Sequence, residues 1–341
     1  MKELRKNVLI DSLYINNSGG FLLLDYLLHR LLLLDISFML LADNRCQGRL
    51  DFCPHVVYMS ASLKNRKQYY QQHKRHYSSV FCFGNIPAPI RMDVPVYTYF
   101  HNINLLTLAE ANTVMKKVAG WLKREVFRHY RKNTDYWIVQ TTNTARELKR
   151  HLYEKDERVR ILPFYKLPDE LLKQKDEEHG NDYVYVANYT GAKGHEELLT
   201  AWTLLHQKGM DKTLHLTVNI NSPFSKRIEE AQARGVRVVN HGLVSFDEVI
   251  KLYKQSKAII YSSHNESLGL GIIEAIEAGC DVIGADLPYI HAVCNPSGLF
   301  DPYSPESIAE AVEKYEDHKQ HNSTLLINNM IDELINLITT S

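Results

Sequence analysis

Short apolar runs alternate with amphipathic stretches along the 341 residues of this chain. In the first half, the pattern predicts a helix at Thr144–Tyr153 and buried strands at Asn7–Ile10, Ser37–Leu41, Val56–Met59, Val80–Phe83, Val96–Phe100 and Tyr136–Gln140. Short, continuous apolar runs are typical of strands that are buried on both faces. Their alternation with helices predicts a parallel sheet that is covered by helices on both sides.

Residues 162–181 interrupt this alternation. They contain Pro163, Pro168 and the charged run KQKDEEHGND, which are typical of a linker. The pattern then starts again, with strands predicted between Tyr183 and Gly284 and helices between the strands, the first of them at His195–Gln207. A chain of this length also suits two domains better than one core.

We therefore predict an α/β protein of two doubly wound, Rossmann-like domains that face a central cleft. In such sheets, ligands bind outside the carboxyl ends of the strands. The first domain is expected at residues 1–165, a linker at 166–182 and the second domain at 183–320. In the last segment, 321–341, the amphipathic pattern of Leu325–Ile338 predicts a helix that packs back on the first domain.

The charges of the chain are distributed unevenly, although 40 basic and 40 acidic residues give a net charge of zero. Residues 1–165 carry 25 Lys and Arg against 14 Asp and Glu, and residues 166–341 carry 15 against 26. A basic half of this kind predicts an anionic partner.

The expected compartment is the cytoplasm. The five cysteines form no C-x-x-C pair, so the sequence predicts neither a disulfide framework nor a thiolate zinc site. The N-terminus lacks the apolar core of a signal peptide. The most apolar stretch, Phe21–Ala42, contains Asp25, Arg30 and Asp35, which are costly inside a bilayer. We expect a soluble protein that can still bind the inner face of the cytoplasmic membrane.

The densest candidate chemistry lies in Ser262–Tyr289, SSHNESLGLGIIEAIEAGCDVIGADLPY. A loop with Glu266 and Gly269 leads into a helix predicted from Gly271, and Glu274 lies one turn inside this helix. Glycines let backbone N–H groups approach a ligand, and a helix N-terminus attracts anions. The carboxylates would repel a phosphate, so neutral hydroxyls are their expected partners. A nucleotide sugar offers both groups. The alternative is a pair of solvated glutamates beside turn-forming glycines.

The string ESLGLGIIEAIEAGCDVIGADLP resembles the E-x7-E signature of retaining glycosyltransferases of family GT4, which have the GT-B fold. Downstream, GLFDPYSPESIAEAV (residues 298–312) resembles the following segment of that family. Upstream, YVANYTGAKGHEELLTAWTLL (residues 185–205) resembles the opening of its second domain. The resemblance covers most of residues 183–315, and over the first 165 residues it is mainly architectural.

This resemblance implies roles for individual residues. Glu266 would contact the donor sugar and Glu274 the ribose hydroxyls, while Lys193 and the loop amides would hold the diphosphate. The implied loop residues are Ser267, Leu268, Gly269, Leu270 and Gly271. One donor-site position departs from the family: Asn188 stands where an arginine is usual, and an amide cannot supply the charge of a guanidinium fork.

In the first domain, the family has a glycine loop after the first strand and a histidine that faces the donor sugar. The matching residues here are Gly19 and Gly20 in YINNSGG and His101 in TYFHN. The alternatives are a plain β-to-α turn and a structural histidine. With these matches, the predicted catalytic residues are His101, Lys193 and Glu266.

Two basic stretches of the first domain contain interleaved aromatic residues. Lys64–Tyr77 includes Tyr69, Tyr70 and Tyr77, and Met115–Lys132 has seven basic residues against Glu125 alone. Basic amphipathic helices with aromatic residues suit anionic membranes, and a solvated helix face is the alternative. No recognition motif for nucleic acid accompanies the charge. The residues expected to face a membrane or an acceptor are Lys116, Lys117, Lys123, Arg124, Arg128, Arg131 and Lys132.

Together these features predict a retaining glycosyltransferase of the hexosyltransferase type. It would move a sugar from a nucleoside-diphosphate-sugar to a hydroxyl of a glycan or lipid-linked glycan, in the synthesis of a bacterial surface polysaccharide such as lipopolysaccharide O-antigen or capsule. No D-x-D triplet occurs, and we expect no metal and no cofactor. Two alternatives stay open: a GT-B sugar-nucleotide epimerase or hydrolase, and a non-enzymatic protein that binds membranes or polyanions.

Overall fold

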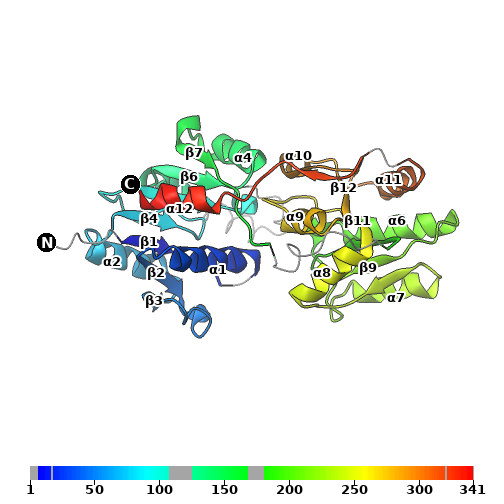
Figure 1. Ribbon diagram of the computed structural model, residues 1–341, viewed down its shortest axis with the longest axis horizontal. Coiled ribbons are helices and arrows are strands. Elements are labelled where there is room, and N and C mark those ends of the chain that lie inside the picture. The colour runs from blue at the N-terminus through cyan, green and yellow to red at the C-terminus, as the bar shows by residue number, and fades with distance from the viewer. Residues whose placement is uncertain (1–6, 17, 107–124, 168–179, 319–320, 341) are drawn as a thin grey trace. The chain divides into compact units, whose positions relative to one another are not determined.

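The computed structural model describes residues 7–16, 18–106, 125–167, 180–318 and 321–340. The chain divides into two compact units. Unit 1 comprises Met1–Lys166 and Asn328–Ser341, and unit 2 comprises Leu167–Ile327. Each unit is built on its own parallel sheet with helices on both faces (Figure 1). The predicted α/β architecture of two Rossmann-like domains is confirmed.

The sheet of unit 1 has seven strands in the order β3-β2-β1-β4-β5-β6-β7. The strand order reverses between β1 and β4, which pair with Asp11 opposite Cys82. Ligand sites of such sheets lie at this reversal, outside the carboxyl ends of the strands. The strands are β1 Val8–Asp11, β2 Phe38–Asp43, β3 Val56–Met59, β4 Ser79–Cys82, β5 Val96–Phe100, β6 Tyr136–Val139 and β7 Val159–Ile161.

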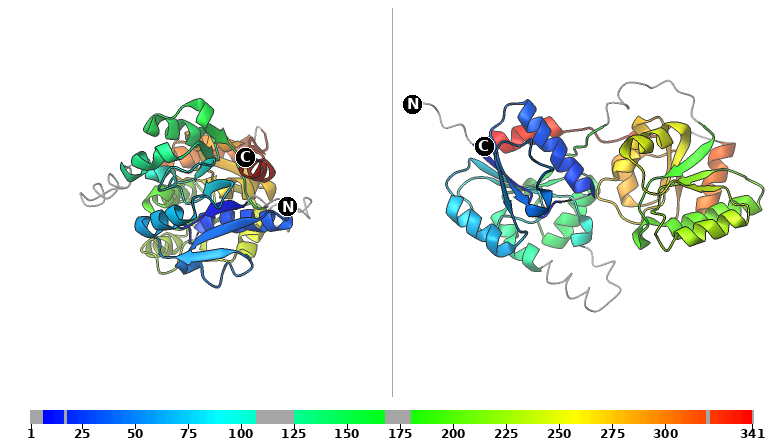
Figure 2. Two further views of the ribbon diagram at one scale, coloured as in Figure 1. Left: turned by 90° about the vertical axis from the view of Figure 1, so that its left-hand side faces the viewer. Right: turned by 90° about the horizontal axis from the view of Figure 1, so that it is seen from below.

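The two faces of this sheet carry separate cores because side chains alternate along each strand. On one face, Val8 and Ile10 of β1 pack with α1 and α12, and on the other, Leu9 packs with α2. Figure 2 shows α1 and α12 side by side. The helices are α1 Ser18–Leu33, α2 Leu63–His73, α4 Thr142–Leu152 and α12 Ile331–Thr339.

The C-terminal helix α12 belongs to unit 1. Its apolar face is spaced at helical intervals, and Leu334 and Ile338 are fully buried in the core beside α1. Arg30 of α1 holds Asp332 of α12 with two hydrogen bonds of 2.9 Å. The backbone carbonyl of Ile338 accepts a hydrogen bond from Ser79 of β4.

Unit 2 has a six-stranded parallel sheet in the order β10-β9-β8-β11-β12-β14, with the reversal between β8 and β11. The strands are β8 Asp182–Tyr185, β9 Leu214–Leu216, β10 Val238–Asn240, β11 Ser256–Tyr261, β12 Asp281–Ala285 and β14 Gly298–Phe300, with a small antiparallel pair of β13 Cys294–Asn295 and β15 Thr324–Leu325. The helices are α6 His195–Gln207, α7 Ser225–Ala233, α8 Phe246–Gln255, α9 Leu270–Glu277, α10 Pro288–Val293 and α11 Pro305–Asp317.

The structure corrects the sequence analysis in two elements. The helix predicted over Leu325–Ile338 begins only at Ile331, because Leu325 pairs in β15 and Asn329 bonds its side-chain amide to the carbonyl of Tyr165. The predicted buried strand Val56–Met59 is half-buried, because β3 is an edge strand that pairs with β2 alone.

Candidate functional site

The loop between β8 and α6 holds Lys193 beside the reversal point of the unit 2 sheet. Gly194 follows it with a φ of +64°, and a Cβ at this position would lie 2.3 Å from the carbonyl oxygen of Ser262. Only glycine fits such a close approach in a left-handed conformation. The hydroxyls of Ser262 and Tyr185 both donate to the carbonyl of Lys193, at 3.0 and 2.9 Å. The lysine backbone is therefore fixed against the ends of β8 and β11.

The loop after β11 delivers an open helix N-terminus to the same edge of the sheet. Helix α9 starts at Leu270 after Gly269, whose φ is +72°, and no side chain caps this end. His264 in the loop donates its backbone N–H to the carbonyl of Ala192 at 2.8 Å, which joins this loop to the Lys193 loop. An uncapped N-terminus leaves N–H donors and a partial positive charge for an anion.

The structure brings the two predicted catalytic residues of unit 2 together. The ammonium of Lys193 forms an ion pair with the carboxylate of Glu266, and these side chains are 29% and 16% exposed. The hydroxyl of Tyr261, at the end of β11, donates to the same carboxylate oxygen at 3.1 Å. The sequence analysis did not include Tyr261 in the site, although its place as the last residue of a strand at the sheet reversal could have identified it.

Glu274 lies one turn into α9 and has no polar partner for its carboxyl group among the described residues. Burial raises the pKa of Glu274 to about 7. The hydroxyl of Tyr253 is buried without a partner, and a Cβ on Gly271 would lie 3.1 Å from it. A free carboxyl beside an open helix N-terminus can accept hydrogen bonds from ligand hydroxyls.

The remaining residues predicted for the donor site lie on these two loops. Asn188 is exposed in the Lys193 loop, and Leu268 is buried. Gly271 is in the first turn of α9. The structure brings these positions to one edge of the unit 2 sheet, and their roles in binding a donor stay predictions.

In unit 1, the structure brings Gly20 and His101 close together. A Cβ on Gly20 would lie 3.5 Å from Nε2 of His101, and Gly19 is its neighbour in the first turn of α1. Burial lowers the pKa of His101 to about 4, so the imidazole is neutral at physiological pH. Asn85, in the loop after β4, bonds to both the ring and the backbone of His101.

The basic residues expected at a membrane or an acceptor are only partly described. Lys116, Lys117, Lys123 and Arg124 lie outside the described residues. Arg128 forms a salt bridge with Glu125 at 2.9 Å, and Arg131 donates to the carbonyl of Leu152. Lys132 is exposed. Two of the three described residues therefore have partners within unit 1.

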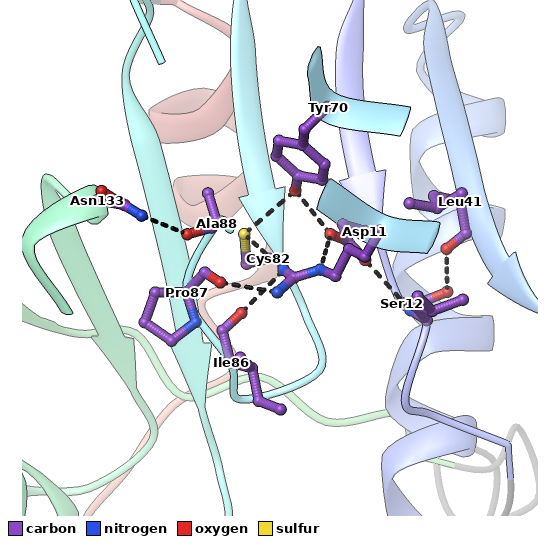
Figure 3. A network of polar contacts seen from close by, with 11 residues as sticks. Asp11, Ser12, Leu41, Tyr70, Cys82, Ile86, Pro87, Ala88 and Asn133 are labelled. Carbon is purple, nitrogen blue, oxygen red and sulfur yellow. Dashed lines mark hydrogen bonds and ion pairs between the residues drawn. The ribbon is translucent and has the colours of Figure 1, made fainter. Parts of the chain in front are cut away.

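In the other basic stretch, Lys64–Tyr77, the prediction that aromatic side chains face a membrane is wrong, whereas membrane contact by its exposed basic residues Lys64, Lys67 and Arg75 stays a prediction. Its three tyrosines are buried in the core on the α2 side of the sheet. Arg66 is also buried, and it bonds to Asp11 at 2.6 Å. Figure 3 shows Tyr70 bonded to the carboxylate of Asp11. The tyrosines and Arg66 recur at helical spacing because this side of the helix packs against the sheet. The many basic residues of the stretch suggested a solvent- or membrane-facing helix instead.

The described residues lack the features of a membrane span and of a metal site. No helix among them is both long and apolar enough to cross a membrane. Within the same ranges, His, Cys, Asp and Glu side chains form no group of three or more that could hold a metal ion.

Unit 2 is similar to proteins of a known family. Residues 169–329 match the family model described as "Glycosyl transferases group 1". The "Serotype-specific mannosyltransferase WbdA" of Escherichia coli is 28% identical over 143 residues, which are 39% of this chain and 17% of that protein. The "Lipopolysaccharide glucosyltransferase WaaG" of Escherichia coli K12 is 25% identical over 195 residues, 52% of each chain. The chain thus spans about half or less of these curated relatives.

The whole chain resembles solved structures in its fold. The crystal structure of WaaG, a glycosyltransferase involved in lipopolysaccharide biosynthesis, has a TM-score of 0.72 at 14% sequence identity. It covers 98% of this chain and 100% of that chain. At this identity the match shows the GT-B fold alone. Residues 169–329 of this chain thus match the group 1 glycosyltransferases, and the chain as a whole has the GT-B fold of the solved WaaG structure.

Proposed function

We propose that the protein is a retaining glycosyltransferase that takes a hexosyl group from a nucleoside-diphosphate-sugar. The acceptor would be a hydroxyl of a glycan or lipid-linked glycan. The relatives are named for mannosyl and glucosyl transfer, two of them in connection with a serotype or lipopolysaccharide. A role in lipopolysaccharide or O-antigen synthesis is therefore the pathway that we propose.

One observation carries this proposal: Lys193 and the open N-terminus of α9 meet at the reversal point of the unit 2 sheet. A cation and unsatisfied N–H donors at one site suit a diphosphate. In the free protein, the carboxylate of Glu266 neutralises Lys193. We infer that the donor diphosphate takes over Lys193 and releases Glu266 to bind the donor sugar.

Glu274 is the proposed partner of the ribose hydroxyls. Its carboxyl is free and lies beside the anion site, where a phosphate would be repelled but a hydroxyl can donate a hydrogen bond. With a pKa of about 7, this group is largely an acceptor above neutral pH. Donor affinity should therefore fall as the pH drops below 7.

In the proposed reaction, the bond between the anomeric carbon and the diphosphate oxygen breaks, and the acceptor oxygen bonds to the same face. The proton of the acceptor hydroxyl passes to the departing phosphate. Lys193 and the helix N-terminus stabilise the negative charge on the diphosphate, and this should be the largest contribution. His101 would contact the sugar from unit 1, and neither glutamate serves as a covalent nucleophile. No metal or cofactor is required.

The chemistry of the acceptor is proposed from the net charge of the first domain. Residues 1–165 have an excess of 11 basic residues, which suits a lipid-linked acceptor with phosphate groups or an anionic membrane surface. The exposed Lys132 is the described residue that best fits such contact. On this proposal the protein is cytoplasmic and peripheral at the inner face of the membrane.

A donor panel tests the proposal. Purified protein is screened by thermal shift against UDP-, GDP-, ADP- and dTDP-hexoses, and turnover of the stabilising donor is followed by release of its nucleoside diphosphate with an extract of bacterial glycolipids as acceptor. Proton NMR of the product then gives the anomeric configuration. We expect one donor class to bind and the product to keep the donor configuration. Binding of no donor, or an inverted product, would contradict the proposal.

A further inference from the structure

Asn85 makes three hydrogen bonds at the carboxyl end of the unit 1 sheet. Its Oδ1 accepts from the backbone N–H groups of His101 and Asn102, at 2.8 and 3.0 Å. Its Nδ2 lies 3.2 Å from Nε2 of His101. Asn85 is 6% exposed and has a φ of +67°, a conformation that non-glycine residues rarely adopt. The residue is thus held in an unusual conformation that directs its amide to one histidine.

These contacts determine which nitrogen of His101 carries the proton. Backbone N–H groups can only donate, so the amide atom that faces them must be the oxygen. The other amide atom is therefore the NH2 group, which also can only donate. Nε2 of His101 must accept this bond through its lone pair. Because the ring is neutral, its single proton lies on Nδ1.

The Nδ1–H group of His101 has no partner. It is buried in the free protein without a hydrogen bond, beside the rings of Tyr99 and Phe83. Buried donors are nearly always paired, and an exception calls for an explanation. A sugar oxygen of a bound substrate would supply the missing acceptor.

The loop that carries Asn85 is fixed by the buried ion pair of unit 1. Figure 3 shows Ile86 and Pro87, the next two residues of this loop, in the same polar network. Besides Asp11, the guanidinium of Arg66 donates to the carbonyls of Pro87 at 2.7 Å and Ile86 at 3.0 Å. The next carbonyl, of Ala88, accepts from Asn133 at 2.8 Å. Three consecutive carbonyls are therefore anchored directly after Asn85, so its amide has little freedom to move away.

We propose that Asn85 is a positioning residue that holds His101 in the Nδ1–H form and so presents a hydrogen-bond donor to a hydroxyl or ring oxygen of the transferred sugar. The inference about the tautomer rests on unit 1 alone. Its use in catalysis rests on the proposed function, in which His101 contacts the sugar.

Nitrogen-15 NMR of the imidazole side chains tests the tautomer directly. The resonances of His101 are identified by their loss in His101→Gln. Wild-type protein should show protonated Nδ1 and unprotonated Nε2. In Asn85→Asp, a carboxylate oxygen can still accept the two backbone bonds, but the other oxygen cannot donate to Nε2, so the proton should move to Nε2. Protonated Nε2 in the wild type, or no change in Asn85→Asp, would overturn the inference.

Asn85→Gly tests the role of the side-chain amide without disturbing the unusual backbone conformation. Glycine adopts a φ of +67° freely, so this variant should keep the loop and the fold while losing the bond to Nε2. Its His101 spectrum should show both tautomers. A single Nδ1–H form in Asn85→Gly would also overturn the inference, because the amide would then have no role.

Donor turnover separates this inference from the proposed function. In Asn85→Asp, kcat should fall at least about tenfold with little change in the donor KM, since binding is retained and only the oriented donor group is lost. Unchanged kcat alongside a switched tautomer would overturn the catalytic part. If the wild type turns over no donor but shows protonated Nδ1, the proposed function fails and the tautomer assignment stands.

Discussion

Two ion pairs of similar chemistry lie in opposite surroundings in this chain. Arg66 and Asp11 in unit 1 are each 1% exposed, whereas Lys193 and Glu266 in unit 2 are 29% and 16% exposed. The guanidinium of Arg66 bonds to a carboxylate and to two backbone carbonyls. The ammonium of Lys193 contacts only Glu266 among the described residues.

This difference separates a structural ion pair from one that can exchange its partner. Removing one member of a buried pair leaves an uncompensated charge in a low-dielectric interior. Lys193 and Glu266 are partly exposed, so water screens this pair more than the buried one, and we expect it to be worth about 1 kcal/mol. An incoming diphosphate can therefore displace Glu266 from Lys193 at small cost, while no ligand can displace Asp11 from Arg66.

The largest effect is expected at the buried pair. Arg66→Met leaves Asp11 charged and unpaired and frees the carbonyls that hold the Asn85 loop. We expect the free energy of unfolding to fall by about 3–5 kcal/mol in urea denaturation. Arg75→Met, at an exposed arginine just after the same helix, is the control and should change stability by about 0.5 kcal/mol or less. If Arg66→Met and Arg75→Met had equal free energies of unfolding, the Arg66–Asp11 pair would not be the structural ion pair that we describe.

At the partly exposed pair of Lys193 and Glu266, the effect should appear in activity and not in stability. Lys193→Ala removes the cation that stabilises the departing diphosphate, so kcat should fall about 10²–10³-fold. The free energy of unfolding should change by about 1 kcal/mol or less. Turnover and urea denaturation are measured on the same preparation, with Lys226→Ala, at an exposed lysine of α7, as the control. Turnover at the wild-type rate would exclude Lys193 from the site.

Glu274 is a partly buried carboxyl group without an ion-pair partner among the described residues. Burial raises its pKa from 4.5 to about 7, so the folded protein holds this proton more tightly than the unfolded chain, and stability is lost as the pH rises between these values. Glu274→Gln should therefore be about 1–3 kcal/mol more stable than the wild type at pH 8 and nearly equal to it at pH 4.5. The same substitution should weaken donor binding.

Urea denaturation at the two pH values checks this expectation, with Glu277→Gln on the same helix as the matched control. Stabilisation of equal size at both pH values would mean that ionisation of Glu274 is not the cause.

The smallest effect is expected at Glu266. Glu266→Gln removes the internal anion from Lys193, so a nucleoside diphosphate no longer has to displace it. Affinity for the free diphosphate should rise by up to about fivefold, since a pair of this exposure is worth at most about 1 kcal/mol. Sugar transfer should fall at the same time, because the sugar loses a proposed contact. Weaker diphosphate binding in this variant would argue against partner exchange.

Much of the fold could be predicted from the sequence, because continuous apolar runs and helical periods are local signals. Helix α6 has the predicted bounds, His195–Gln207. Short or edge elements such as β7 and α7 were not predicted, because their hydrophobic pattern is too weak to identify them. The start of α12 at Ile331 depends on a tertiary contact, the bond of Asn329 to Tyr165, which no local pattern contains.

In the candidate site too, local features could be predicted from the sequence and tertiary contacts could not. Glycine positions and the spacing of Glu266 and Glu274 were readable because they lie on one loop and helix. The pairing of Glu266 with Lys193 joins residues 73 positions apart and could not be read from either segment. The buried tyrosines of α2 were mistaken for a membrane face, since helical spacing of aromatic residues is the same whether the partner is a sheet or a bilayer.

The central claim is that Lys193 and the N-terminus of α9 bind the diphosphate of the donor. Isothermal titration calorimetry with the nucleoside diphosphate of the best donor tests it most directly, on wild-type protein and on Lys193→Ala. We predict specific binding by the wild type and at least about tenfold weaker binding by the variant, the loss expected for a charge-assisted bond worth about 1.5–3 kcal/mol. Equal dissociation constants for the two proteins would contradict the claim.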